Sequence, residues 1–257
     1  MERHDGKMKK RCTAVVLAAG SGKRMKSSVA KQFIQLDGKP LIWYALRAVE
    51  DSEIIDDCIL VTGEEDIPYV RREIVEKYGF GKVDAVIAGG AERCFSVANA
   101  LQVIAGEKMK AANRDGYVFI HDGARPFLTR EILRDTYSAA EAYHACVAAV
   151  PSKDTVKIAD ESGFVAATPA RELLWSIQTP QVFDTKLIVK AYEMLLEKWD
   201  DLREQGIVVT DDAGVVELLT DTKVKLVTAS YGNIKITTPE DLAIAEKLLS
   251  DMKQGIK

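Results

Sequence analysis

Histidine, cysteine and long apolar runs are scarce in this sequence, and each scarcity excludes a class of protein. Three histidines and four widely separated cysteines provide none of the short spacings that metal-binding motifs require. No apolar run approaches the roughly 20 residues of a membrane-spanning helix, and the charged residues 1–11 do not resemble a secretory signal. We therefore expect a cytoplasmic protein that contacts no membrane and keeps its cysteines reduced and buried.

An excess of positive charge is missing as well. The 257 residues carry a formal net charge of −4, which provides no basic footprint for nucleic acid. Internal repeats and low-complexity segments are also absent. Because 47% of the residues are hydrophobic, the chain can bury a large core. We predict a single domain over residues 1–257 that binds no nucleic acid.

The common nucleotide-binding motifs are incomplete in the glycine loop at residues 20–22, which follows an apolar run at 14–19. A dinucleotide fingerprint needs a third glycine where Met25 stands, and a P-loop needs serine or threonine where Arg24 stands. A buried strand that ends in such a loop nevertheless exposes backbone N–H groups that can bind an anion. The cations that follow the loop include Lys23, Arg24 and Lys31. The stretch therefore indicates a site for a nucleoside triphosphate, the alternative being a tight turn with solvated charges.

Short apolar runs alternate with amphipathic stretches along most of the chain. The expected strands lie at residues 14–19, 58–61, 83–88, 118–120, 145–150 and 224–228. The expected helices lie at residues 66–78, 92–105, 130–143, 184–198 and 211–219, and from Pro239 onward. This alternation predicts an α/β fold with a Rossmann-like, mostly parallel sheet and helices on both faces. Ligands bind beyond the carboxyl ends of such strands. Glycine-bearing loops follow these ends at Gly20, Gly63, Gly89 and Gly123.

The alternation stops between residues 151 and 178, where short β-like pieces replace helices. A loop-rich excursion of this length is usually functional. Its apolar residues Phe164 and Trp175 need a surface to pack against. We therefore expect residues 151–178 to form a protruding β-arm that pairs with a second subunit, which makes the protein a homodimer.

Seven segments resemble, in the same order, the motifs of the sugar-phosphate and polyol-phosphate cytidylyltransferases. They are residues 17–25 with 31–33, 89–97, 121–127, 154–157, 178–181, 210–213 and 233–242. The resemblance implies a nucleotidyltransferase fold and a reaction in which a phosphate oxygen of the polyol phosphate attacks the α-phosphorus of CTP and pyrophosphate leaves. Such chemistry depends on positive charge and in-line positioning rather than on a side-chain nucleophile. The sequence agrees, because it contains no serine elbow and no evident Cys/His pairing.

Within this family the motifs favour methylerythritol phosphate, an isoprenoid precursor of the non-mevalonate route, as the second substrate. The segments that favour it are residues 92–93, 96–97, 124–125 and 210–213. Ribitol 5-phosphate is the alternative substrate. An alternative from another class is a nucleotide-binding regulatory protein without turnover.

The resemblance also implies roles for individual residues. The cations expected to stabilise the transition state are Arg24, Lys31 and Lys235. The residues expected to contact the nucleotide are Ala18, Ala19, Gly20, Gly90, Ser96, Asp122 and Lys235. The residues expected to contact methylerythritol phosphate are Asp122, Arg125, Thr155, Arg171, Thr179 and Thr210. Some of these are expected to come from the neighbouring subunit's arm. Mg²⁺ is expected to be bound mainly through the CTP phosphates, and no residue is assigned to it.

Two positions depart from the family's pattern. Ala30 replaces the proline that usually precedes Lys31, so the loop should be less constrained. Ala91 replaces a polar residue near the base or ribose, so we expect one nucleotide contact to be missing or supplied by water. We expect no catalytic histidine, and His121 is expected to order its own loop.

Overall fold

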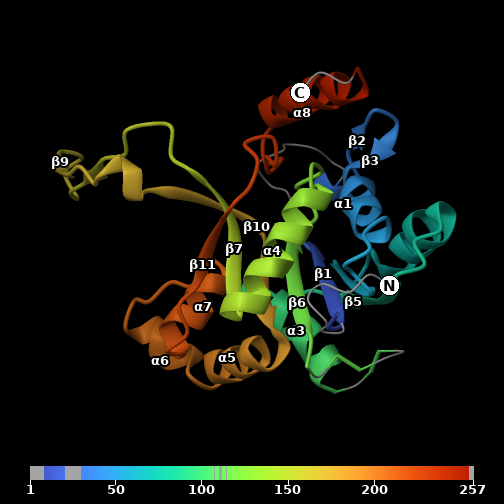
Figure 1. The fold of residues 1–257 in the computed structure, drawn as a ribbon, viewed down its shortest axis with the longest axis horizontal. Coiled ribbons are helices and arrows are strands. Elements are labelled where there is room, and N and C mark those ends of the chain that lie inside the picture. The colour runs from blue at the N-terminus through green and yellow to red at the C-terminus, as the bar shows by residue number, and fades with distance from the viewer. Residues whose placement is uncertain (1–8, 21–29, 107, 110–111, 114, 255–257) are drawn as a thin grey trace.

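A seven-stranded sheet lies at the centre of the computed structural model, which describes residues 9–20, 30–106, 108–109, 112–113 and 115–254 (Figure 1). The order of its strands is β11-β7-β10-β6-β1-β4-β5. Their bounds are β1 Cys12–Ala18, β4 Asp57–Thr62, β5 Val83–Ala88, β6 Tyr117–Asp122, β7 Ala145–Pro151, β10 Trp175–Asp184 and β11 Lys225–Thr228. Strand β10 runs antiparallel to both neighbours, whereas the other pairs are parallel. The predicted mostly parallel α/β sheet is confirmed.

Helices cover both faces of this sheet. One face carries α1 (Leu41–Glu50) and α4 (Arg130–Tyr143), and the other carries α3 (Arg93–Ala105), α5 (Thr185–Glu197) and α7 (Asp212–Leu219). Side chains alternate between the faces along β1, because Val16 joins the cluster that contains α1 and Val15 joins the cluster that contains α3. Burial on both faces explains why these strands are continuous apolar runs in the sequence.

A third cluster joins the last helix to the region that follows β1. Helix α8 (Pro239–Lys253) packs with β2 (Gln35–Leu36) and the start of α1. A capping box fixes its start, since the Thr238 hydroxyl accepts from the N–H of Asp241 and the Asp241 carboxylate accepts from the N–H of Thr238. Just before it, the buried Ile236 donates its N–H to the carbonyl of Ala124 at 2.9 Å. This contact brings Lys235 beside the loop that follows β6.

Shorter elements complete the described chain. They are η2 (Lys31–Phe33), β3 (Lys39–Pro40), α2 (Ile67–Tyr69), the π-helical η3 (Val70–Glu76), η4 (Arg171–Leu173) and α6 (Trp199–Glu204). The predicted helix at residues 66–78 is therefore a short α-helix that continues as a π-helix. None of the described helices combines the length and the apolar character that a membrane-spanning segment requires.

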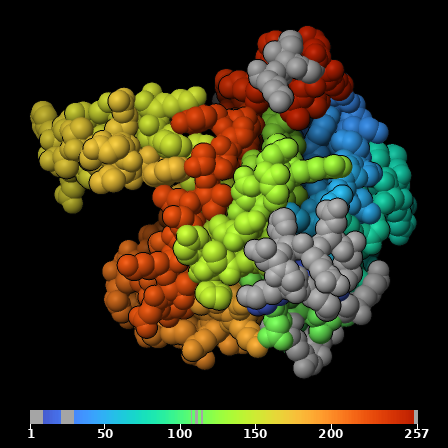
Figure 2. Space-filling model, viewed as in Figure 1, coloured from blue at the N-terminus to red at the C-terminus, as the bar shows by residue number. Residues whose placement is uncertain are grey.

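Between β7 and β10 the chain leaves the sheet and projects from the body (Figures 1 and 2). This excursion contains the small hairpin of β8 (Ile158–Ala159) and β9 (Val165–Ala167). Its apolar side chains Phe164 and Leu173 are 73% and 78% exposed. The predicted end of the excursion at residue 178 is wrong, because residues 175–178 already belong to β10 within the sheet.

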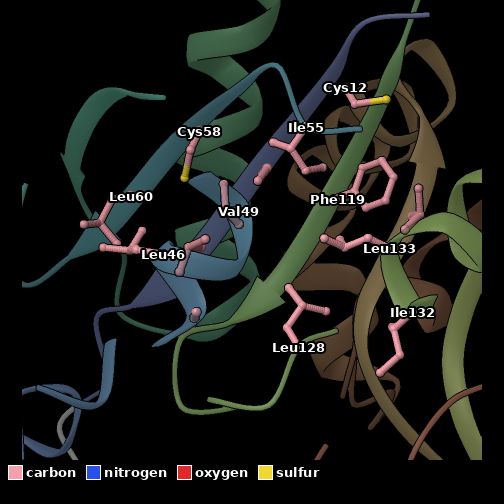
Figure 3. Packing of buried hydrophobic residues seen from close by; sticks show 14 of the residues in the cluster. Cys12, Leu46, Val49, Ile55, Cys58, Leu60, Phe119, Leu128, Ile132 and Leu133 are labelled. Carbon is pink, nitrogen blue, oxygen red and sulfur yellow. The ribbon is translucent and has the colours of Figure 1, made fainter. Parts of the chain in front are cut away.

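The hydrophobic cluster around Phe119 shows how the central strand β6 holds helices against the sheet (Figure 3). Phe119 of β6 is 1% exposed and lies in one cluster with Leu133 of α4 and Leu46 of α1. The four cysteines are buried with free thiols, as expected from their apolar surroundings in the sequence.

Replacing Phe119 by alanine should lower the free energy of unfolding by about 3–5 kcal/mol, because the cavity left in a two-sided core collapses only partly. Urea denaturation followed by circular dichroism measures this loss. Val208→Ala is the control: Val208 is 80% exposed, so its truncation should change stability by less than about 0.5 kcal/mol. Equal effects of the two changes would contradict the central place given to β6.

Candidate active site

Two adjoining cavities lie among the described residues at the carboxyl end of the sheet. The first cavity has a volume of about 380 Å³ and is lined by the ends of β1 and β6, by η2 and by the start of α3. The second cavity has a volume of about 410 Å³ and is lined by residues of β7, β10, β11 and α7. Both cavities are lined by Arg93, Asp122 and Lys235. A ligand in the first cavity would therefore meet a ligand in the second across these three side chains.

Two glycines after β5 shape the wall of the first cavity. A Cβ on Gly89 would lie 2.4 Å from the Cβ of Ala19, and a Cβ on Gly90 would lie 2.3 Å from the Cβ of Phe95. The N–H of Gly90 donates to Ser96 Oγ at 3.0 Å, so Ser96 orders this loop. The loop leads into α3, and a helix N-terminus at a cavity favours a bound anion.

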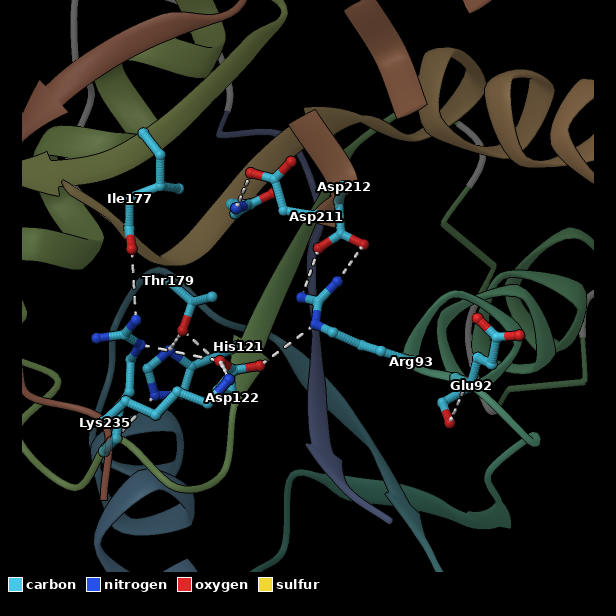
Figure 4. Close-up of polar contacts among 12 residues, drawn as sticks. Glu92, Arg93, His121, Asp122, Ile177, Thr179, Asp211, Asp212 and Lys235 are labelled. Atoms are coloured by element: carbon cyan, nitrogen blue, oxygen red, sulfur yellow. Dashed lines mark hydrogen bonds and ion pairs between the residues drawn. The ribbon is translucent and has the colours of Figure 1, made fainter. Parts of the chain in front are cut away.

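Asp122 ends β6 and is the centre of the shared group (Figure 4). Lys235 Nζ lies 2.7 Å from its Oδ2, Arg125 Nε lies 3.9 Å from the same oxygen, and Arg93 Nε donates to Oδ1 at 3.5 Å. Burial would raise the pKa of the Asp122 carboxyl, but Arg93 and Lys235 hold it well below its usual value. Asp122 is therefore a carboxylate at any physiological pH.

Arg93 bridges two carboxylates that are distant in the sequence. Its Nη1 and Nη2 donate to Asp212 Oδ1 and Oδ2 at 2.9 and 2.7 Å, in the bidentate geometry that suits a guanidinium (Figure 4). The Tyr192 hydroxyl donates to the same Asp212 Oδ1 at 2.6 Å. Burial opposes the charge of Arg93, but Asp212 and Asp122 raise the pKa of this guanidinium above its ordinary value.

A neutral hydrogen-bond network lies behind Asp122. His121 Nε2 faces the carbonyl of Arg125 at 3.2 Å, which can only accept, so this nitrogen carries the proton. His121 Nδ1 then accepts from the Thr179 hydroxyl at 3.0 Å, and Thr179 Oγ1 accepts from the N–H of Asp122 at 3.0 Å. Burial lowers the pKa of His121 to about 4. His121 thus orders the loop after β6 as a neutral side chain.

Arg125 is held by backbone carbonyls from two other segments. Its Nη1 donates to the carbonyl of Asn233 at 2.8 Å, and its Nη2 donates to that of Ile177 at 3.5 Å. Asn233 in turn donates to the carbonyl of Thr179 at 2.9 Å. These bonds join the end of β6, β10 and the segment that contains Lys235.

The structure brings most of the proposed site residues together. The first cavity is lined by Ala18, Ala19, Gly20, Lys31, Gly90, Ser96, Asp122 and Lys235. The second is lined by Asp122, Arg125, Thr179, Thr210 and Lys235. Thr155 and Arg171 lie exposed in the excursion and line neither of these cavities. Arg24 lies outside the described residues. The departures Ala30 and Ala91 differ in position, since Ala91 lines the first cavity whereas Ala30 precedes η2.

Sequence reasoning gave no site role to three residues that the structure places at or behind the cavities: Arg93, Gln181 and Asp212. Gln181 lines the second cavity, donates to Asp211 Oδ2 at 2.9 Å and accepts from the N–H of Ala213 at 2.9 Å. A signal was present for Arg93, because an arginine that opens a helix three residues after a glycine pair is placed to meet an anion. For Asp212, 119 residues away from Arg93, no spacing rule applies.

A mostly parallel sheet covered by helices, with a glycine-lined cavity at its carboxyl end and cations around it, defines an α/β nucleotidyltransferase. Within that class, the chain belongs to the 2-C-methyl-D-erythritol 4-phosphate cytidylyltransferase family, whose model matches residues 12–251. The family resemblance predicted from the motifs is thereby confirmed.

Individual relatives agree over nearly the whole chain. A 2-C-methyl-D-erythritol 4-phosphate cytidylyltransferase of Lachnospira eligens is 50% identical over 91% of this chain and 96% of its own length. The 2-C-methyl-D-erythritol 4-phosphate cytidylyltransferase of Lachnoclostridium phytofermentans is 45% identical over 95% of this chain and 98% of its own length. The crystal structure of 4-diphosphocytidyl-2C-methyl-D-erythritol synthase from Anaerococcus prevotii has a TM-score of 0.77 and 34% identity, and covers 95% of this chain and 100% of that one.

The neutral state of His121 predicts a titration that NMR can follow. The imidazole resonances should keep the shifts of the Nε2–H tautomer down to about pH 5 and titrate with a pKa of about 4. Because the unfolded chain protonates histidine near pH 6.5, protonation favours unfolding as the pH falls from about 6.5 to 4. The His121→Gln variant assigns the resonance and should lack this part of the pH dependence of stability. A His121 that titrates near pH 6.5 would contradict the buried neutral assignment.

Proposed function

We propose that this protein transfers the cytidylyl group of CTP to 2-C-methyl-D-erythritol 4-phosphate, which yields 4-diphosphocytidyl-2-C-methyl-D-erythritol and pyrophosphate. Relatives of 50% and 45% identity carry the name of this enzyme. The observation that carries the proposal is the pair of cavities that share Arg93, Asp122 and Lys235. Two phosphorylated substrates need such adjoining sites, because one must attack the phosphorus of the other. Free, buried thiols are consistent with work in the reducing cytoplasm.

We infer that CTP occupies the first cavity. The backbone at Ala18, Ala19 and Gly20 lines that cavity beside Gly90 and Ser96, so small residues let the nucleotide approach the main chain. The alcohol phosphate then occupies the second cavity, lined by Arg125, Thr179 and Thr210. In this arrangement a phosphate oxygen forms a bond to the α-phosphorus while the bond from that phosphorus to the leaving pyrophosphate breaks.

Charge stabilisation is the main contribution that the side chains make to this exchange. The attacking phosphate and the triphosphate are both anionic, so their approach requires cations at the contact. Lys31 lines the first cavity and Lys235 lines both. Arg24 completes the proposed set by family resemblance. Asp122 holds Lys235 at 2.7 Å, which keeps this ammonium at the boundary between the two substrates.

We propose that Mg²⁺ enters with the CTP phosphates. Among the described residues, no three His, Cys, Asp or Glu side chains come together in a way that could hold a metal ion. The Asp122 carboxylate lines both cavities but already faces Lys235, Arg93 and Arg125. Because these protein side chains offer so few metal ligands, a magnesium ion would be held mainly by substrate oxygens, where it would neutralise phosphate charge.

A pyrophosphate-release assay tests the proposed reaction. The protein with Mg²⁺, CTP and 2-C-methyl-D-erythritol 4-phosphate should release pyrophosphate and form the diphosphocytidyl product in equal amounts. UTP and ATP should react much more slowly, and EDTA should abolish the reaction because the triphosphate charge is then unshielded. Faster release with ribitol 5-phosphate would reject the proposed substrate, and no release with either alcohol would favour a regulatory nucleotide-binding protein.

Removal of single cations should lower turnover without unfolding the protein. We expect Lys31→Ala, Lys235→Ala and Arg24→Ala each to reduce kcat by about 10²–10³-fold, as the loss of a transition-state stabiliser typically does. Lys190→Ala is a matched control, since Lys190 is exposed on α5 and lines neither cavity. Its kcat should stay within about twofold of the unmodified protein. A variant of the first set with unchanged kcat would remove that residue from the mechanism.

We further propose that the protein is a homodimer whose arm completes the neighbour's second cavity. Thr155 and Arg171 are exposed and line neither cavity of their own chain. The exposed Phe164 and Leu173 of the same excursion provide apolar surface for such pairing. Arg171 could then grip the substrate phosphate in a bidentate manner.

A mixing experiment distinguishes this arrangement from a site within one chain. Lys31→Ala and Arg171→Ala should each be nearly inactive alone. When the two are unfolded together and refolded, half of the dimers are mixed and each mixed dimer regains one intact site, so about a quarter of the original activity should return. Refolding each variant by itself is the control. If the refolded mixture stays inactive, both residues act within the same chain.

A further inference from the structure

Arg93, at the boundary of the two cavities, forms a bidentate ion pair with a buried carboxylate that lines neither of them. Asp212 is 0% exposed and takes both terminal nitrogens of Arg93 at 2.9 and 2.7 Å. The Tyr192 hydroxyl, from α5, donates to the same carboxylate at 2.6 Å. Asp212 is also the first residue of α7, where the helix dipole favours a negative charge. Three elements, α3, α5 and α7, thus meet at one guanidinium.

Asp212 lies outside the reach of a ligand in either cavity. Its chain neighbours Asp211 and Ala213 line the second cavity, whereas Asp212 and Tyr192 line neither. The Asp212 carboxylate therefore acts on a bound substrate through its partner Arg93, which lines both cavities. A buried ion pair adds little stability compared with apolar packing, so stability alone is a weak reason for this arrangement.

We propose that Asp212, supported by Tyr192, is a positioning residue. It holds the terminal nitrogens of Arg93 away from Asp122, so that Asp122 remains paired with Lys235. The distances support this arrangement. Arg93 gives its two terminal nitrogens to Asp212 and reaches Asp122 only through Nε at 3.5 Å. Asp122 is left with Lys235 as its nearest cation, at 2.7 Å. This inference rests on the proposed cytidylyl transfer, in which Lys235 acts between the substrates.

Loss of the Asp212 charge would change that arrangement. A neutral side chain at position 212 holds a guanidinium less strongly, so Arg93 would turn toward Asp122, its nearest remaining carboxylate. Arg93 and Lys235 would then compete for one carboxylate. A shift of about 1 Å in Lys235 is enough to slow a positioned reaction about 10²-fold. Binding of CTP depends on the other lining groups and should change less.

Steady-state kinetics of the intact protein with CTP and 2-C-methyl-D-erythritol 4-phosphate test the proposal. Asp212→Asn should lower kcat by about 10–100-fold while the KM for CTP changes by less than about threefold. Tyr192→Phe removes only the donor to Asp212 and should lower kcat by about three- to tenfold. In an Arg93→Gln background, Asp212→Asn should add less than about a twofold loss, because the residue acts through Arg93. The activity of the unmodified protein in the same assay reports separately on the proposed function.

Two further measurements separate positioning from a structural role. Asp57→Asn is the matched control, since Asp57 is 5% exposed and pairs with Arg11 at the start of β4, away from the cavities. It should lower the melting temperature and leave kcat unchanged. In NMR spectra the Arg93 Nη–H signals, assigned with Arg93→Gln, should exchange slowly with water in the original protein and faster in Asp212→Asn, because these groups donate to Asp212.

Three results would overturn the proposal. The first is an unchanged kcat in a folded Asp212→Asn variant, and the second is a full additional loss in the Arg93→Gln background. The third is an unchanged kcat in Tyr192→Phe, which decides the question if Asp212→Asn fails to fold.

Discussion

The Asp122 carboxylate is the charge on which the arrangement of the site depends. Arg93, Arg125 and Lys235 come from α3, from the loop after β6 and from the segment before α8, and all three cations face this one side chain. Without it, three buried or half-buried cations would repel one another. A carboxylate at the end of the central strand therefore offsets their repulsion and gives each a fixed place.

The strand order explains how such distant segments meet. Strand β6 lies between β1 and β10, and the parallel strands β1, β4 and β5 end at the same edge as β6. The segments after β1 and β5 build the first cavity on one side of Asp122. The antiparallel β10 supplies Thr179 and Gln181 on the other side, where the second cavity lies. One strand end thus separates the two cavities.

The sequence predicts the parallel part of this design well and the antiparallel part poorly. Buried parallel strands are continuous apolar runs, and this pattern is visible in the sequence alone. Strand β10 contains Pro180, which cannot donate a ladder hydrogen bond, and its register with β7 shifts between Ile177 and Gln181. Its identity comes from pairing with β6 and β7, which no local pattern encodes. The same limit applies to Asp212, whose partner Arg93 is distant in the chain. Family motifs, not periodicity, pointed to Lys235.

The charges of the cluster also explain why its neighbours are neutral. Arg93, Arg125 and Lys235 carry three positive charges against the two negative charges of Asp122 and Asp212, so the cluster keeps an excess of one positive charge. A protonated histidine beside it would add a further buried positive charge, and burial holds the pKa of His121 at about 4. The network of His121 and Thr179 can therefore fix the loop through hydrogen bonds alone. In the proposed transfer between two anions, this excess positive charge would face the phosphates at the boundary of the cavities.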